Sequence, residues 1–153
     1  MPCAPHPRKR ITRREKCARA LKRLQDLPPD HGSRGRSALV VDDAGIIRFL
    51  MCSCLKRLGF SRVDLAANGL EALDRLADNP PDVVFTDYHM PVMDGGAFVA
   101  NVREVPTLGK LPVVLLTSGN IQEDTWRNLG FTEYLRKPFS WADLMVLVSR
   151  LER

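Results

Sequence analysis

Short apolar runs alternate with helix-like segments from residue 37 to the end of the chain. Each run is rich in β-branched residues, and each following segment spaces its apolar residues as on one face of a helix. Alternating strands and helices build a parallel sheet that helices cover on both faces. We expect strands at residues 38–41, 63–66, 83–86, 111–116 and 133–135, and helices at 46–58, 68–77, 96–103, 121–129 and from about 141 onward.

Helix-capping and turn residues separate these segments. Asn68 with Glu71, and Ser140 with Asp143, have the spacing of residues that cap a helix start. Gly59 closes the first expected helix. Right-handed crossovers leave few arrangements of five such units, and the strand order 2-1-3-4-5 is the common one at this size. Its switch point lies between the first and third strands, where the carboxyl ends of the strands form a crevice.

Basic residues are concentrated before the alternating region. Residues 1–36 hold eleven Lys and Arg against three acidic residues, a charge of +8, whereas residues 37–153 hold 12 basic and 15 acidic residues, a charge of −3. The chain length of 153 residues fits one domain at 37–153 and an appendage, the basic arm and linker at 1–36. We expect a short helix near residues 12–26 and disorder elsewhere in the arm, because Thr12 and Glu15 have capping-box spacing and the segment ends at Pro28-Pro29.

Three interpretations of the arm stay open. It is a solvated or disordered tail without a role, since a charge run is usually a solvated surface. Alternatively, it binds nucleic acid or an acidic partner electrostatically. In the third interpretation, a helix with Cys17, Ala20, Leu21 and Leu24 on one face docks on a partner protein or on its own domain. The arm has no aromatic residue for base stacking and no metal-finger spacing, so nothing indicates sequence-specific recognition.

The chain lacks the marks of a secreted or membrane protein. No apolar run reaches the ~18 residues of a membrane span, and the N-terminus lacks the apolar core of a secretory signal. The four cysteines show no CxxC metal pattern and no disulfide framework. We therefore expect reduced thiols in a soluble, cytoplasmic protein.

Acidic residues follow two of the expected strands. Asp42 and Asp43 end the first strand and Asp87 ends the third. In the 2-1-3-4-5 order these strands are neighbours, so the three carboxylates converge at the switch point. Two unit charges ~4 Å apart repel by about 4 kcal/mol at an effective dielectric of 20, so the cluster needs a cation. Oxygen ligands of this kind favour Mg²⁺, which keeps waters and leaves positions for phosphate oxygens.

A hydroxyl and an ammonium follow the two remaining strands of the crevice. Thr117 ends the fourth strand and Lys137 the fifth. Together with a divalent ion and an aspartate, these groups can transfer a phosphoryl group: Asp87 attacks in line, Lys137 neutralises charge, and Thr117 donates a hydrogen bond to an equatorial oxygen.

Four segments then resemble the receiver domain of two-component response regulators, a family with the flavodoxin-like form of this α/β fold. The resemblance spans residues 37 to 153. It rests on Val40-Val41-Asp42-Asp43, on Thr86-Asp87-Tyr88-His89-Met90-Pro91-Val92-Met93-Asp94-Gly95, on Leu116-Thr117-Ser118, and on Tyr134-Leu135-Arg136-Lys137-Pro138-Phe139.

The resemblance implies a role for each site residue. Asp87 would accept a phosphoryl group from a phosphohistidine on a histidine kinase or phosphotransfer protein. Mg²⁺ would be held by Asp42, Asp43, Asp87 and the backbone carbonyl of His89.

Further implied roles concern switching. Thr117 and Tyr134 look like the family's switch pair, with the threonine drawn to the phosphate and the ring turning inward. Lys137-Pro138 looks like the family's cis peptide.

Several features stand out against the family's usual pattern. Ala44-Gly45 follow the acidic pair where polar residues are frequent, which predicts a loosened start of the first helix. The interval from Thr117 to Lys137 is short, which predicts a truncated fourth helix in the domain. His89, like Gly119, stands where this family tunes acyl-phosphate hydrolysis, and we predict that His89 alters that rate.

These observations favour a self-phosphorylating and self-dephosphorylating switch over a turnover enzyme. Because the chain stops at Arg153, after the last expected helix, we expect a stand-alone receiver that acts on an unknown protein target or relays phosphate. The alternative is phosphorylation-regulated binding of nucleic acid or an acidic partner through the basic arm. A haloacid-dehalogenase-like phosphatase is disfavoured because such enzymes generally have an acidic residue two positions after the aspartyl nucleophile, where this chain has His89. A degenerate receiver is disfavoured by the intact set of acidic, threonine and lysine residues.

Overall fold

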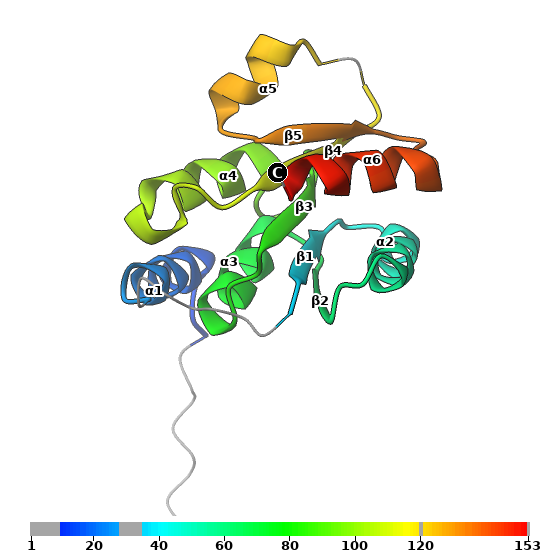
Figure 1. Ribbon diagram of the computed structural model, residues 1–153. Helices are drawn as coiled ribbons and strands as arrows, with labels where there is room; N and C mark the ends of the chain where they lie inside the picture. The colour runs from blue at the N-terminus through cyan, green and yellow to red at the C-terminus, as the bar shows by residue number, and fades with distance from the viewer. Residues whose placement is uncertain (1–9, 28–34, 120, 153) are drawn as a thin grey trace, which may run out of the picture.

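The computed structural model describes residues 10–27, 35–119 and 121–152, and within them five parallel strands form one sheet. The strand order is β2-β1-β3-β4-β5, as the sequence predicts. The strands are β1 (Ser37–Val41), β2 (Arg62–Ala66), β3 (Val83–Asp87), β4 (Val113–Thr117) and β5 (Glu133–Arg136). All of their carboxyl ends therefore point to the same edge of the sheet (Figure 1).

Helices cover both faces of the sheet (Figure 1). Two of them lie on one face, and three lie on the other together with a helix that precedes the first strand. They are α1 (Arg13–Gln25), α2 (Gly45–Arg57), α3 (Gly69–Asp78), α4 (Gly95–Glu104), α5 (Glu123–Leu129) and α6 (Trp141–Leu151), with a 3-10 turn η1 (Pro106–Leu108) after α4.

Alternating side chains of the strands build two cores. Val83 and Phe85 of β3 face the core under α2 and α6, whereas Val84 faces the core under α3 and α4. The central strands are buried on both faces, which is why they appear as nearly continuous apolar runs in the sequence. Burial of this kind contributes about 1.5–3 kcal/mol for each large apolar side chain.

The predicted helix starts form with their caps. Ser140 and Asp143 make a reciprocal capping box at α6, and Asn68 accepts a hydrogen bond from the backbone N–H of Glu71 at α3. The carboxylate of Glu71 accepts from the N–H of Ala67 rather than from that of Asn68, so the second pair is not reciprocal. At α2 the cap residue Ala44 supplies no side-chain hydrogen bond, as its methyl group dictates.

One strand and one helix are shorter than the sequence pattern or a regular helix would give. The fourth strand begins at Val113 rather than at the predicted Leu111, and the carbonyl of Pro112 accepts a hydrogen bond from Val84 just before it. Helix α5 has only seven residues, which confirms the truncation predicted from the short interval between Thr117 and Lys137.

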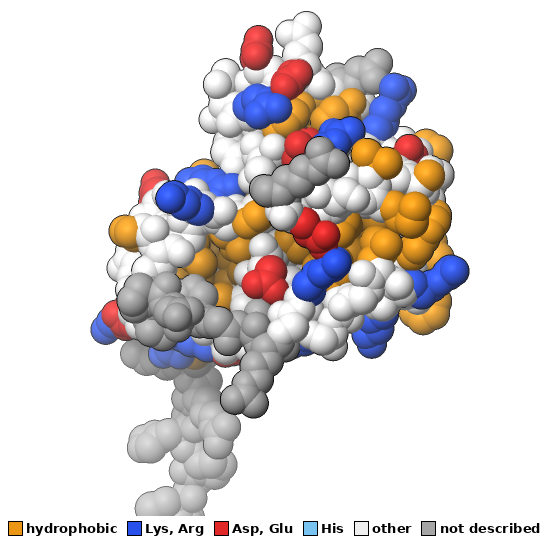
Figure 2. All heavy atoms as spheres, viewed as in Figure 1, with side chains coloured by type: hydrophobic (Ala, Val, Ile, Leu, Met, Phe, Trp, Pro, Cys, Tyr) orange, Lys and Arg blue, Asp and Glu red, His pale blue; other side chains and the backbone are white. Residues whose placement is uncertain are grey.

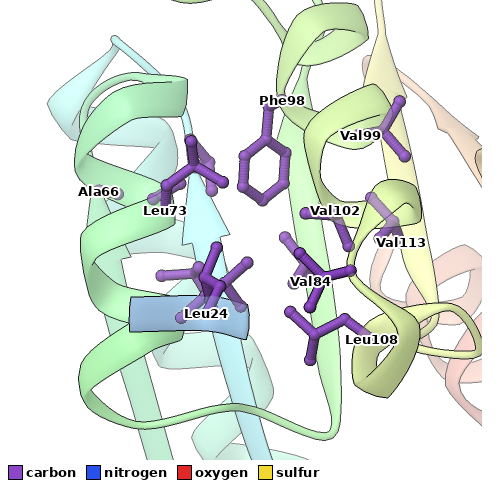
Figure 3. Packing of buried hydrophobic residues seen from close by; sticks show 14 of the residues in the cluster. Leu24, Ala66, Leu73, Val84, Phe98, Val99, Val102, Leu108 and Val113 are labelled. Atoms are coloured by element: carbon purple, nitrogen blue, oxygen red, sulfur yellow. The ribbon is translucent and has the colours of Figure 1, made fainter. Parts of the chain in front are cut away.

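Helix α1 lies against α3 (Figure 1). Thr12 and Glu15 form its capping box, and Ala20 and Leu24 are fully buried in the core that α3 and α4 share. Figure 3 shows Leu24 pointing into this core. The other predictions for the arm, at residues 1–9 and 28–34, lie outside the described residues. In the parts of the chain that are described, no helix has both the length and the apolar character needed to cross a membrane.

Candidate functional site

Three carboxylates meet at the carboxyl edge of the sheet. Asp42 and Asp43 follow β1, and Asp87 ends β3, the strand that pairs with β1. One carboxylate oxygen from each residue lies within 4.8 Å of the other two. Because β1 and β3 are neighbours in the sheet, Asp42 and Asp87 lie close together although they are 45 positions apart in the sequence.

Asp42 is the most buried member, with 1% of its side chain exposed. Its Oδ1 accepts a hydrogen bond from the N–H of Ala44 at 2.9 Å, and its Oδ2 accepts one from Lys137 Nζ at 2.8 Å. The Arg48 guanidinium donates to the Asp42 backbone carbonyl at 2.6 Å. A buried carboxylate needs such partners, so Lys137 neutralises a charge that would otherwise be unpaired.

Asp87 is held from two sides. Its Oδ1 accepts a hydrogen bond from the N–H of Tyr88 at 2.8 Å, and its Oδ2 lies 3.7 Å from Lys137 Nζ. Partial burial raises the pKa of the Asp87 carboxyl, and the Lys137 ammonium opposes this rise. The charge of Asp42 raises the pKa further, the Tyr88 N–H lowers it, and Asp43 raises it. The ionised form of Asp87 is therefore under-stabilised without a further cation.

The loop after Asp87 packs tightly around a glycine. Gly95 begins α4, and its N–H donates to the Tyr88 carbonyl at 2.7 Å. A Cβ atom on Gly95 would lie 2.3 Å from the Asp87 carbonyl oxygen, so any other residue would displace the loop. The sequence places a turn here but gives no sign of this close approach.

Thr117 and Lys137 stand side by side at the ends of β4 and β5. Thr117 is buried, and its carbonyl accepts a hydrogen bond from the Lys137 N–H at 2.6 Å. In the β3–β4 register Asp87 pairs with Leu116, which puts Thr117 one residue beyond the acceptor. Its Oγ1 accepts from the Gly119 N–H at 3.2 Å. The peptide Lys137-Pro138 is cis, as the resemblance implied.

Two further predicted site residues lie on the surface. The Tyr134 ring is 37% exposed and lies against Trp126, with ring centroids 5.8 Å apart. The ring thus lies outward in this structure, and its inward turn when Thr117 is drawn to the phosphate stays a prediction. His89 is exposed and meets Tyr88 edge-on at 5.0 Å, while the role of its carbonyl stays a prediction.

Arg48 and Gly95 are two members of the site that the sequence pattern did not reveal. Arg48 lies six residues after Asp42, a spacing that returns the guanidinium to the acidic turn once α2 forms. The contact could have been predicted only from the exact residue at which α2 begins, and Ala44-Gly45 made that start difficult to place.

The donor set suits a hard divalent cation. Three carboxylates supply only oxygen ligands, and Mg²⁺ takes such ligands while keeping several waters. The partly buried Lys137 ammonium beside them suits charge that develops on a phosphoryl group.

Comparison with known proteins decides the family. Residues 38–149 match the model of the response regulator receiver domain. The chain belongs to this family. The match confirms the predicted resemblance and the predicted fold class.

Receiver domains of this family are signalling switches that respond to phosphorylation and bind Mg²⁺ at the acidic site. Homologous response regulators interact with histidine kinases and with downstream targets. The matched region leaves out α1, and nothing in the comparisons supports nucleic-acid binding through the basic arm.

Relatives cover most of this chain but differ in length. Protein PilG of Pseudomonas aeruginosa is 34% identical over 115 residues, 74% of this chain and 84% of PilG. The sensor histidine kinase CheAY of Helicobacter pylori is 38% identical over 116 residues, which are 73% of this chain but only 14% of CheAY. The response regulator Rre1 of Synechocystis is 37% identical over 75% of this chain and 51% of Rre1.

Solved structures have the same fold. The chemotaxis response regulator CheY4 of Vibrio cholerae aligns with a TM-score of 0.71 at 33% identity, over 76% of this chain and 98% of CheY4. The receiver domain of sensor histidine kinase PA1611 from Pseudomonas aeruginosa aligns with a TM-score of 0.70 at 28% identity, over 78% and 99% of the two chains. That structure has a magnesium ion coordinated in its active-site cleft.

Proposed function

We propose that Asp87 accepts a phosphoryl group from a phosphohistidine on a histidine kinase or phosphotransfer protein, and that the modified domain switches its interaction with a protein target. One observation carries this proposal. Three carboxylates converge within 4.8 Å beside a lysine that contacts two of them, an arrangement that is unfavourable unless it serves cation and phosphate chemistry.

The chemical step is an in-line displacement. An oxygen of the Asp87 carboxylate attacks phosphorus and forms the acyl phosphate, while the phosphorus–nitrogen bond breaks and its electron pair stays on the imidazole. Lys137 Nζ, now shared between Asp42 and Asp87, offsets negative charge on the transferred group. The buried hydroxyl of Thr117 donates a hydrogen bond to one phosphoryl oxygen.

Asp42, Asp43 and Asp87, with the carbonyl of His89, are the residues that would hold Mg²⁺. The ion would supply charge neutralisation at the phosphoryl oxygens. This chain's own contribution is to fix the ligands. The Ala44 N–H, the Arg48 guanidinium and the Tyr88 N–H each hold one oxygen of the acidic residues in place.

Switching would pass from Thr117 to Tyr134. Phosphorylation adds negative charge at the crevice and biases two arrangements that already exchange. In the arrangement seen here the Tyr134 ring lies outward beside Trp126 and borders a surface hollow of about 460 Å³ with Val146 and Arg150 of α6. Withdrawal of the ring would reshape this hollow, which makes the β5–α6 surface the proposed output surface.

The test is phosphorylation by a small phosphodonor. Wild-type protein incubated with acetyl phosphate and Mg²⁺ gains an acid-stable, base-labile phosphoryl group, and Asp87→Asn does not. Asp124→Asn, at an exposed position in the first turn of α5, is the matched control and stays fully labelled. Equal labelling of the Asp87→Asn variant would refute the assignment.

A further inference from the structure

Helix α1 lies outside the family match yet is part of the packed structure. The receiver model begins at residue 38, whereas α1 covers Arg13–Gln25. Ala20 and Leu24 are fully buried and belong to the same core as Leu73 of α3 and Val84 of β3. Figure 3 shows Leu24 directed toward these two residues. An isolated 13-residue helix is marginal in water, so this packing is what keeps α1 helical.

Ion pairs fix the position of α1 along α3. Arg23 pairs with Asp78 and lies 3.8 Å from Asp74. Both aspartates are on α3, one turn apart. The neighbouring Lys22 is exposed and has no ion pair with any residue that the structure describes. Arg23 is therefore the residue of α1 whose charge is paired with α3 in the part of the chain that the structure describes.

The other end of α1 reaches the loop that follows Asp87. Arg13 and Lys16 border a hollow of about 270 Å³ whose opposite side is formed by Asn68 and Val92. Val92 belongs to the loop of residues 88–94 between β3 and α4, which we call the acceptor loop.

The acceptor loop is strained at Val92, the loop residue that lines the same hollow as Arg13 and Lys16 of α1. Val92 has a φ of 72°, a left-handed conformation that is rare for β-branched residues. The Met93 N–H donates to the Pro91 carbonyl at 2.8 Å, which closes a γ-turn around Val92. Strain of this kind persists only where surrounding structure holds it.

The acceptor loop is connected to the site residue by hydrogen bonds. The Met93 carbonyl accepts from the N–H of Gly69 at the start of α3, at 3.0 Å. At the other end of the loop, the Tyr88 carbonyl accepts from Gly95 while the Tyr88 N–H donates to Asp87 Oδ1. These hydrogen bonds form a continuous path from the start of α3 through the acceptor loop to the carboxylate of Asp87.

We propose that α1 is a positioning helix: docked on α3, it holds the acceptor loop in its strained form and thereby fixes the orientation of Asp87 for Mg²⁺ and phosphate. The restraint of the acceptor loop by α1 is inferred only from the packing and hydrogen bonds described above. The consequence for Mg²⁺ and phosphate rests on the proposed function. Because α1 is anchored by two buried side chains, by the partly buried Cys17 and Leu21, and by Arg23, and lies outside the sheet, we expect it to open as a local unit before the rest of the domain does.

The experiment compares two full-length variants with equal charge change. Arg23→Glu removes the ion pairs to α3, whereas Lys22→Glu changes the exposed neighbour. Hydrogen–deuterium exchange is measured on α1 and on residues 88–94, and Mg²⁺ affinity is measured by calorimetry. In Arg23→Glu we expect exchange of both segments to rise about fivefold and the Mg²⁺ dissociation constant to rise about threefold. In Lys22→Glu we expect the exchange of α1, the exchange of residues 88–94 and the Mg²⁺ dissociation constant to stay at their wild-type values.

Two further variants make the result decisive. Adding Asp74→Arg and Asp78→Arg to Arg23→Glu restores opposite charges and returns exchange and affinity toward wild type. Leu24→Ala frees α1 by a different contact and produces the same changes. Faster exchange of α1 with unchanged exchange of residues 88–94 would overturn the proposal. Protection of α1 that stays at the wild-type level in both Arg23→Glu and Leu24→Ala would overturn it as well.

Failure of this proposal is distinguishable from failure of the proposed function. Exchange of the acceptor loop is measured without metal or phosphate, so it reports the restraint even if Asp87 is not the acceptor. Phosphorylation of wild type but not of Asp87→Asn, with an unaltered loop in Arg23→Glu, would keep the function and discard the positioning role of α1.

Discussion

Replacing Asp87 by asparagine should make the metal-free protein more stable at neutral pH. Asparagine has the same shape and keeps an oxygen that accepts the Tyr88 N–H. It removes one negative charge from a cluster of three. The substitution therefore isolates the electrostatic penalty that the site imposes on the fold.

The magnitude follows from the distances. The oxygen atoms lie no more than 4.8 Å apart, so at an effective dielectric of 20 the repulsion between two carboxylates is at least about 3.5 kcal/mol, and Asp87 experiences it from Asp42 and from Asp43. Attraction to Lys137 Nζ at 3.7 Å offsets about 4.5 kcal/mol of this. Because Asp43 is exposed and its charge is screened, we expect a net gain of about 1–2 kcal/mol, or a rise in Tm of about 3–6 °C.

The dependence on pH has a definite sign. Burial and the neighbouring carboxylates raise the pKa of Asp87 in the folded state above its usual value of 3.8. The ionised carboxyl consequently destabilises the fold at pH values above this raised pKa, and below the unfolded-state value the penalty is absent. The advantage of Asp87→Asn is full at pH values above the folded-state pKa of Asp87 and shrinks as the pH falls through that pKa.

Urea unfolding at several pH values, without and with Mg²⁺, provides the assay. Mg²⁺ at ten times its dissociation constant adds about 1.4 kcal/mol to the wild type and so narrows the difference from the variant. Asp124→Asn, outside the cluster, should show no gain at any pH. A wild type that is as stable as Asp87→Asn in metal-free buffer at pH 7 would refute the electrostatic reasoning.

Three other substitutions test separate parts of the account. Lys137→Met leaves buried Asp42 without its ammonium and should lower the free energy of unfolding by about 2–4 kcal/mol without Mg²⁺; an unchanged urea midpoint would contradict this. Val92→Asn relieves the left-handed strain and should raise the free energy of unfolding by about 1 kcal/mol, and a loss of stability would show that the strain is not stored there. Gly95→Ala should lower Tm much more than Gly96→Ala, because the added Cβ meets backbone at 2.3 Å in the first case and the flexible Tyr88 side chain at 3.0 Å in the second; equal Tm values would disprove the close approach.

The sequence predicted the sheet because its signals are local. Strand β3 shows as an apolar run, the caps of α6 show as Ser140 and Asp143, and right-handed crossovers then leave few strand orders. Once the order is known, residues at the carboxyl ends must share one edge. This is why Asp42 and Asp87 could be placed together without coordinates.

Features that depend on three-dimensional packing were not accessible in this way. The face of α1 with Ala20 and Leu24 was visible as a helical stripe, but a stripe does not say what covers it. The positive φ of Val92 was hidden, because valine gives no sign of a left-handed conformation. The outward position of Tyr134 was hidden too, because its ring packs beside Trp126, eight residues earlier and on a different element.

Exposed apolar side chains also escaped prediction. Ile46, Phe49 and Leu50 of α2 are at least half exposed, which the expected helix at 46–58 did not indicate. Figure 2 shows hydrophobic side chains gathered on this side of the molecule, over α2 and the start of α6. Periodicity identifies the apolar face of a helix but not whether another element covers that face.

The most direct test of the central claim is to locate the phosphoryl group on the chain. Wild-type protein is phosphorylated with acetyl phosphate and Mg²⁺, the acyl phosphate is reduced with borohydride, and the resulting homoserine is located by peptide mass spectrometry. The account predicts homoserine at position 87 alone, and none when Mg²⁺ is removed. Homoserine at position 42 or 43, or labelling that is independent of Mg²⁺, would contradict it.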